Sequence, residues 1–186
     1  LRTAFGAEDP DLVLRIVAAP AAMAMRPGAE TRGLRYTGEV LRGRPDAIRE
    51  STGNLGPTLE LRRGERVRIE VVNRFGEPTV IHWHGLRLDS RFDGVPGLSQ
   101  TAVEPGQSFT YQLVFPDGGI FWYHPHVRED IQQDLGLYGN IFVQPSRPDA
   151  WGPVHREEFL ILDDLLVGDD GLVPWGRDEP THAAMG

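Results

Sequence analysis

The stretch Arg66-Val67-Arg68-Ile69-Glu70-Val71 alternates charged residues with β-branched apolar ones. Successive side chains of a β-strand point to opposite faces of a sheet, so this alternation predicts a half-buried strand. Residues 108–115 repeat the pattern, because Phe109, Tyr111, Leu113 and Phe115 share one face of an extended chain. These two stretches predict a protein built from strands with one apolar face.

Similar short segments, rich in β-branched or aromatic residues and bounded by Gly, Pro or Asp, occur on both sides of this stretch. Strands of this length with regular turn signals are typical of a β-sandwich or barrel. Residues 19–33 and 41–56 are expected to be loops, and residues 130–135 are a short helix candidate. The predicted strands are residues 12–18, 34–40, 58–61, 66–73, 79–84, 108–115, 120–124 and 140–144.

The last part of the chain differs in composition from the rest. Residues 163–186 are acidic and rich in Gly and Pro, although residues 158–162 could form a strand. We therefore expect one domain over residues 1–150. Residues 151–186 are expected to be a linker or the start of a second domain.

Bulk composition excludes several classes of function. A net charge of −8 argues against nucleic acid as the main ligand, because binding phosphates requires an excess of clustered Lys and Arg. No apolar run approaches the roughly 18–20 residues needed to span a membrane. Cysteine is absent, which excludes disulfides, thiolate zinc sites and a blue-copper centre within this chain.

Four of the six histidines form two His-x-His pairs, His82 with His84 and His124 with His126. Residues i and i+2 of a strand project from one face, about 6.6 Å apart at roughly 3.3 Å per residue. Two such pairs facing each other would line a gap with four imidazoles. That spacing is wide for one small ion and suits two or more metals.

The ligand type favours copper, with zinc second. Imidazole binds copper, zinc, iron and nickel, and the affinity of a nitrogen site is highest for copper. A single histidine in a strand is more often an ordinary surface or hydrogen-bonded residue than a ligand. His155 and His182 lack a paired histidine, and we interpret them in that way.

Several motifs occur in the order found in one protein family. The segment from residue 56 to 145 resembles the first domain of laccase-type multicopper oxidases. The match begins at Gly56-Pro57-Thr58-Leu59 and ends near Leu135-Gly136-Leu137-Tyr138-Gly139. Between them the resemblance rests on Ile81-His82-Trp83-His84-Gly85, on residues 92–100 and 103–111, and on Phe121-Trp122-Tyr123-His124-Pro125-His126.

The resemblance implies an all-β, cupredoxin-like Greek-key sandwich or barrel followed by a C-terminal linker. It also implies a copper cofactor in type 2 and type 3 sites, shared with residues outside this chain. His82 would ligate the type 2 copper, and His84, His124 and His126 would ligate the paired type 3 coppers. Asp93 would be a catalytic residue that relays protons to oxygen; the alternative is an ordinary turn residue before Gly94.

The function implied is that of the N-terminal part of a copper-dependent oxidoreductase. The chain would contribute half of a trinuclear cluster that reduces dioxygen to water while a phenolic, amine or metal-ion substrate is oxidised. Its other partners would be the remaining cupredoxin domains, on the same or an associated chain. By resemblance we expect a periplasmic or secreted protein.

Two departures from the family keep an alternative open. The later histidine-rich motif and the His-Cys-His segment of the family do not occur in these 186 residues. The chain alone is therefore expected to be inactive, as a fragment of a longer protein or a partner of another chain. The alternative is a non-catalytic cupredoxin-type module that binds copper or another protein.

Overall fold

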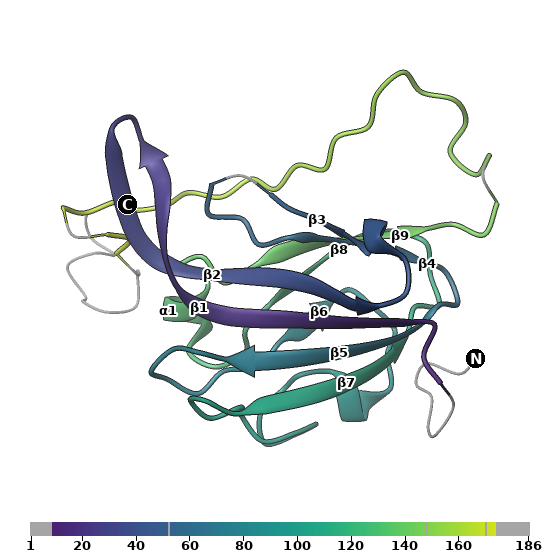
Figure 1. The fold of residues 1–186 in the computed structure, drawn as a ribbon, viewed down its shortest axis with the longest axis horizontal. Helices are drawn as coiled ribbons and strands as arrows, with labels where there is room; N and C mark the ends of the chain where they lie inside the picture. The colour runs from purple at the N-terminus through teal and green to yellow at the C-terminus, as the bar shows by residue number, and fades with distance from the viewer. Residues whose placement is uncertain (1–8, 52, 148, 170, 174–186) are drawn as a thin grey trace.

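The computed structural model describes residues 9–51, 53–147, 149–169 and 171–173. Two β-sheets pack against each other across an apolar core (Figure 1). This arrangement confirms the predicted all-β class. Within the described residues, no helix is long and apolar enough to cross a membrane.

The first sheet has the strand order β2-β1-β5-β7. Its members are β1 (Leu12–Arg26), β2 (Ala29–Arg42), β5 (Arg66–Asn73) and β7 (Ser108–Val114). β1 and β5 run parallel, whereas the other neighbours are antiparallel. The alternation that marked β5 is realised, with Val67, Ile69 and Val71 buried and its charged residues part-exposed.

The second sheet has the order β3-β4-β9-β8-β6. It contains β3 (Ile48–Arg49), β4 (Thr58–Arg62), β6 (His82–His84), β8 (Gly119–His124) and β9 (Gly139–Gln144). Along β9, Ile141 and Val143 face the core, and Phe142 points away from it. A one-turn helix, α1 (Glu129–Gln132), connects β8 to β9.

The prediction of a loop over residues 19–33 was wrong, because β1 and β2 continue as a long hairpin through this region. The turn between them contains Pro27 and Gly28, and Gly28 has a φ of +73°. β1 pairs with β5 only as far as Ala18. Pro20 therefore lies where β1 has a partner on one side only, so its missing N–H costs no sheet hydrogen bond.

Three other predictions need correction. The expected loop over residues 41–56 contains a 3-10 turn (Pro45–Ala47) and β3. The expected strand over residues 79–84 is regular only from His82, and Thr79 makes an isolated bridge to Val103. The helix is four residues long, from Glu129.

The predicted strand over residues 158–162 is also absent, since this segment is extended but pairs with no strand. The chain after β9 runs along the outer face of the second sheet (Figure 1). There the ring of Phe142 packs against Trp151 and Phe159, with centroids 5.5 and 4.6 Å apart. Phe142 is an apolar side chain on the face of β9 that points away from the core. Its contacts explain why this segment lies against the sheet.

Candidate metal centre

The two histidine pairs meet because β6 and β8 are antiparallel neighbours. His82 is directly opposite His124, and Trp83 is directly opposite Tyr123. Trp83 and Tyr123 are fully buried in the core between the sheets. The alternation of a strand then forces the histidines onto the outer face of the second sheet, as the sequence predicted for His82 and His84.

The fourth histidine is placed by a different element. β8 ends at His124, so His126 lies in the turn that leads to α1 rather than in the strand. Its ring is nevertheless close to that of His82, with centroids 4.4 Å apart. Ring nitrogens of His82, His124 and His126 all lie within 4.8 Å of one another.

His84 joins this group through His124. Its Nδ1 atom is 3.1 Å from Nε2 of His124. Histidine nitrogens bind zinc at about 2.0–2.1 Å, and two such ligands at roughly tetrahedral or right angles are then about 2.9–3.4 Å apart. The His84–His124 separation thus has the geometry of two ligands on one ion.

Backbone carbonyls fix the tautomers of two rings. Nδ1 of His82 lies 2.6 Å from the carbonyl oxygen of Asp93, and Nδ1 of His124 lies 2.9 Å from that of Pro125. Because a carbonyl oxygen only accepts hydrogen bonds, each Nδ1 carries the proton and donates it. Nε2 of both rings is therefore unprotonated and has a lone pair, as in many metal-binding histidines, and in His124 this lone pair accepts a hydrogen bond from Nδ1 of His84.

Burial favours the neutral form of two of the rings, His124 and His126. Burial is the main reason that the pKa of His124 is lowered to about 4; the neighbouring rings contribute to the shift, and the hydrogen bond to Pro125 opposes it. Burial also lowers the pKa of His126, followed by the influence of His82, while Glu129 opposes the shift. A neutral imidazole with a free lone pair is the form that binds a metal.

Asp93 contacts the group mainly through its backbone. Its carbonyl oxygen holds His82, while its carboxylate Oδ1 is 3.8 Å from the same Nδ1 atom, and its side chain is 36% exposed. The next residue, Gly94, has a φ of +78°, and a Cβ there would lie 1.8 Å from the carbonyl oxygen of Ile81. The absence of a side chain at Gly94 therefore allows the Asp93 carbonyl to reach His82.

Two residues beside the group were not singled out in the sequence. Trp122 stacks on His124, with ring centroids 4.0 Å apart and an interplanar angle of 18°. Its position two residues before His124 on the same strand face was the available signal. Oε2 of Glu129 lies 3.9 Å from Nε2 of His126, a contact that depends on the turn into α1. His155 is exposed, and His182 lies outside the described residues.

Comparisons with known proteins agree with this arrangement. The sequence model of a family described as multicopper oxidase matches residues 46–148. Copper resistance protein A of Escherichia coli is 37% identical over 109 residues, which cover 59% of this chain and 18% of that protein. The multicopper oxidase MmcO of Mycobacterium tuberculosis is 39% identical over 114 residues, 61% of this chain and 21% of that protein.

A solved structure shows the same likeness in three dimensions. The crystal structure of a multi-copper oxidase from Pseudomonas thermotolerans aligns with a TM-score of 0.62 and 37% identity. The alignment covers 73% of this chain and 30% of that one. The chain spans about a fifth of the length of the curated relatives it matches.

Gly94→Ala should destabilise the fold much more than Gly97→Ala. Both residues have a φ near +75°, but a Cβ at Gly97 would meet nothing within 4 Å. We expect Gly97→Ala to cost about 1–2 kcal/mol for the left-handed backbone. Gly94→Ala should cost about 1–3 kcal/mol more, because the new Cβ meets backbone that cannot move freely. Equal losses in denaturant unfolding would contradict this role of Gly94.

The metal-free chain should lose stability as the pH falls from about 6.5 to about 4. In this range the unfolded His124 binds a proton and the folded one does not, so protons favour the unfolded state. NMR titration of the His124 ring should give a midpoint near 4. In His124→Gln, the fall in stability across this range should be smaller; an unchanged fall would show that other groups cause it.

Proposed function

Because this chain belongs to the multicopper oxidase family, whose cofactor is copper, we propose that it supplies half of a trinuclear copper site in a longer oxidase. His82 ligates the type 2 copper, and His84, His124 and His126 ligate the type 3 pair. The observation that carries this proposal is that both His-x-His pairs come together at one sheet face. In addition, the Nδ1 atoms of His82 and His124 donate hydrogen bonds to backbone carbonyl oxygens.

The donor set supports copper in particular. Four imidazoles without a thiolate form a nitrogen site, for which copper has the highest affinity among the divalent first-row metals. Copper, when bound, would pass electrons from the reducing substrate to dioxygen, which is reduced to water. The chain's own residues would hold the metals, carbonyls fix the tautomers of His82 and His124, and burial favours the neutral form of His124 and His126.

The site is incomplete within these 186 residues. Three copper ions with three or four ligands each require more donors than four imidazoles provide. Because the chain has no cysteine, the blue-copper centre that accepts electrons from substrate also lies on other residues. The position of the histidines on the outer face of the second sheet supports this view, since a second unit can approach them there.

Asp93 has two roles in this proposal. Its backbone carbonyl orients His82, and its part-exposed carboxylate holds a proton beside the cluster and transfers it toward oxygen. The electron donor of the whole protein is a small phenolic, amine or metal-ion reductant. The protein works in the periplasm or outside the cell, where copper and oxygen are available.

The chain should bind copper through these histidines and should show no intense thiolate absorption in the visible range. His124→Ala removes a buried ligand and should weaken Cu(II) affinity by at least about 10–100-fold, the loss seen when even supporting residues of a metal site are removed. His155→Ala is the matched control, because His155 is exposed in the segment after β9. Equal affinity in the two variants, measured by competition with a chelator, would refute the proposed site.

In the longer protein, Asp93→Asn should slow oxygen reduction by about 10²–10⁴-fold, the range for loss of a general acid. Copper content should stay unchanged, because the Asp93 carbonyl that holds His82 is retained. Asp117→Asn, which alters an exposed carboxylate paired with Arg87, serves as the control. Normal oxygen consumption in Asp93→Asn would restrict Asp93 to its backbone role.

A further inference from the structure

Trp122 occupies an unusual position for a large aromatic residue. It lies directly opposite His84 in the β6–β8 pairing and two residues before His124 on β8. Ile120, Trp122 and His124 therefore share the outer face of the second sheet, away from the core. Trp83 offers a contrast, because it is fully buried on the opposite face.

The indole of Trp122 touches two members of the histidine group. It stacks on His124 at a centroid distance of 4.0 Å and 18°, and it lies 4.9 Å from the ring of His84 at 33°. These are the two rings whose Nδ1 and Nε2 atoms face each other at 3.1 Å. One flat side chain thus lies beside both nitrogens that have the geometry for a common ion.

Hydrogen bonds alone leave these rings incompletely fixed. The Pro125 carbonyl holds one nitrogen of His124, but a ring held at one point can still tilt about that bond. His84 is exposed, and its ring makes a hydrogen-bond contact with His124. A planar surface against both rings limits the tilt that the hydrogen bonds permit.

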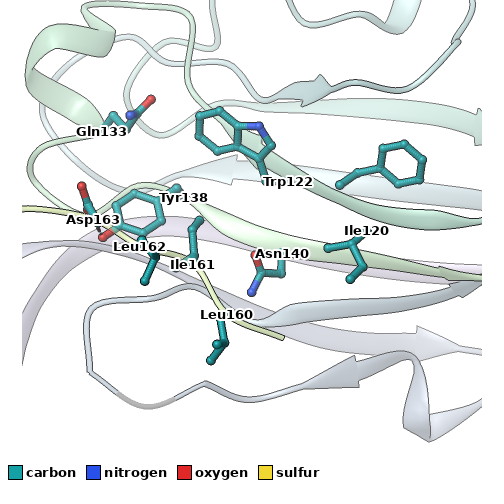
Figure 2. A pocket seen from close by; sticks show the side chains of 10 residues that line it. Ile120, Trp122, Gln133, Tyr138, Asn140, Leu160, Ile161, Leu162 and Asp163 are labelled. Atoms are coloured by element: carbon teal, nitrogen blue, oxygen red, sulfur yellow. Dashed lines mark hydrogen bonds between the residues drawn. The ribbon is translucent and has the colours of Figure 1, made fainter. Parts of the chain in front are cut away.

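Trp122 lies outside the apolar core and is surrounded by residues of the outer sheet face. It lines a cavity of about 370 Å³ with Gln133, Tyr138 and Asn140, on the side of the sheet covered by residues 160–163 (Figure 2). It is part-exposed and does not belong to the buried cluster that joins the two sheets. Its packing therefore contributes less to the fold than that of Trp83, and its contacts with the histidines need another explanation.

We propose that Trp122 is a positioning residue for the metal site, and that its indole holds the rings of His84 and His124 in the orientation that binds copper. The inference rests on the proposed function, because it assigns Trp122 a task at the copper site. A ligand set that is already ordered loses less conformational freedom when the metal binds, so affinity rises.

The test uses three variants of this chain. Trp122→Leu removes the planar surface, Trp122→Phe keeps a smaller one, and Ile120→Ala removes an apolar side chain that lines the same cavity on the same strand face. Cu(II) affinity is measured by competition with a chelator. The ring protons of His84 and His124 are observed by NMR in the metal-free state, and circular dichroism checks that each variant is folded.

We expect Trp122→Leu to weaken Cu(II) binding about tenfold or more, as is usual when a residue that supports metal ligands is lost. Trp122→Phe should recover most of this affinity, and Ile120→Ala should bind like the original chain. In the original chain, the His124 ring protons should be shifted upfield by the ring current of the indole, and this shift should vanish in Trp122→Leu.

Several results would overturn the proposal. Unchanged affinity in Trp122→Leu would do so, as would a loss in Trp122→Phe equal to that in Trp122→Leu. If Trp122→Leu does not fold, the NMR spectrum of the original chain still decides, because unshifted His124 protons mean that the stack does not exist in solution. Failure of the original chain to bind copper would instead refute the proposed function.

Discussion

The pairing of β6 with β8 is the interaction on which the rest of the site depends. Burial of Trp83 and Tyr123, directly opposite each other, fixes which face of each strand points to the core. A shift of one residue in this pairing would move the aromatic side chains to the surface and the histidines inward. The same burial that stabilises the sandwich therefore brings His82, His84 and His124 together on the outer face.

Backbone carbonyl groups orient two of the histidine rings that the strand pairing brings together. The carbonyl oxygens of Asp93 and Pro125 accept hydrogen bonds from His82 and His124, so the nitrogen that carries the proton is defined in each ring. The first of these contacts depends on Gly94, whose lack of a Cβ lets the loop approach the backbone at Ile81. We infer that the orientation of the histidine rings is set by loop backbone and by the face of Trp122.

The site lies at the surface of the domain rather than inside it. The segment after β9 already covers part of the same sheet face, through Phe142 and its aromatic neighbours. His84 remains exposed beside it. The proposed half-site on a sheet face fits a protein in which a second unit supplies further ligands.

The sequence by itself determined the local features. Alternation identified β5 and β7, the His-x-His spacing placed His82 and His84 on one face, and the absence of cysteine excluded a thiolate site. These features depend on the two-residue period of a strand and on the chemistry of single side chains. Both can be recognised in a sequence segment of a few residues. The ordered motifs around them pointed to the family, and hence to the cupredoxin class and copper.

Only the tertiary structure decided which strands are neighbours and what surrounds the ligands. The sequence did not reveal that β1 and β2 form a long hairpin through residues 19–33, because pairing with β2 outweighs the turn-like composition there. The sequence placed His126 on one strand face with His124, which was wrong because β8 ends at His124, and it did not reveal the stack of Trp122 on His124. Such contacts join residues through packing and register, and strand periodicity carries no information about either.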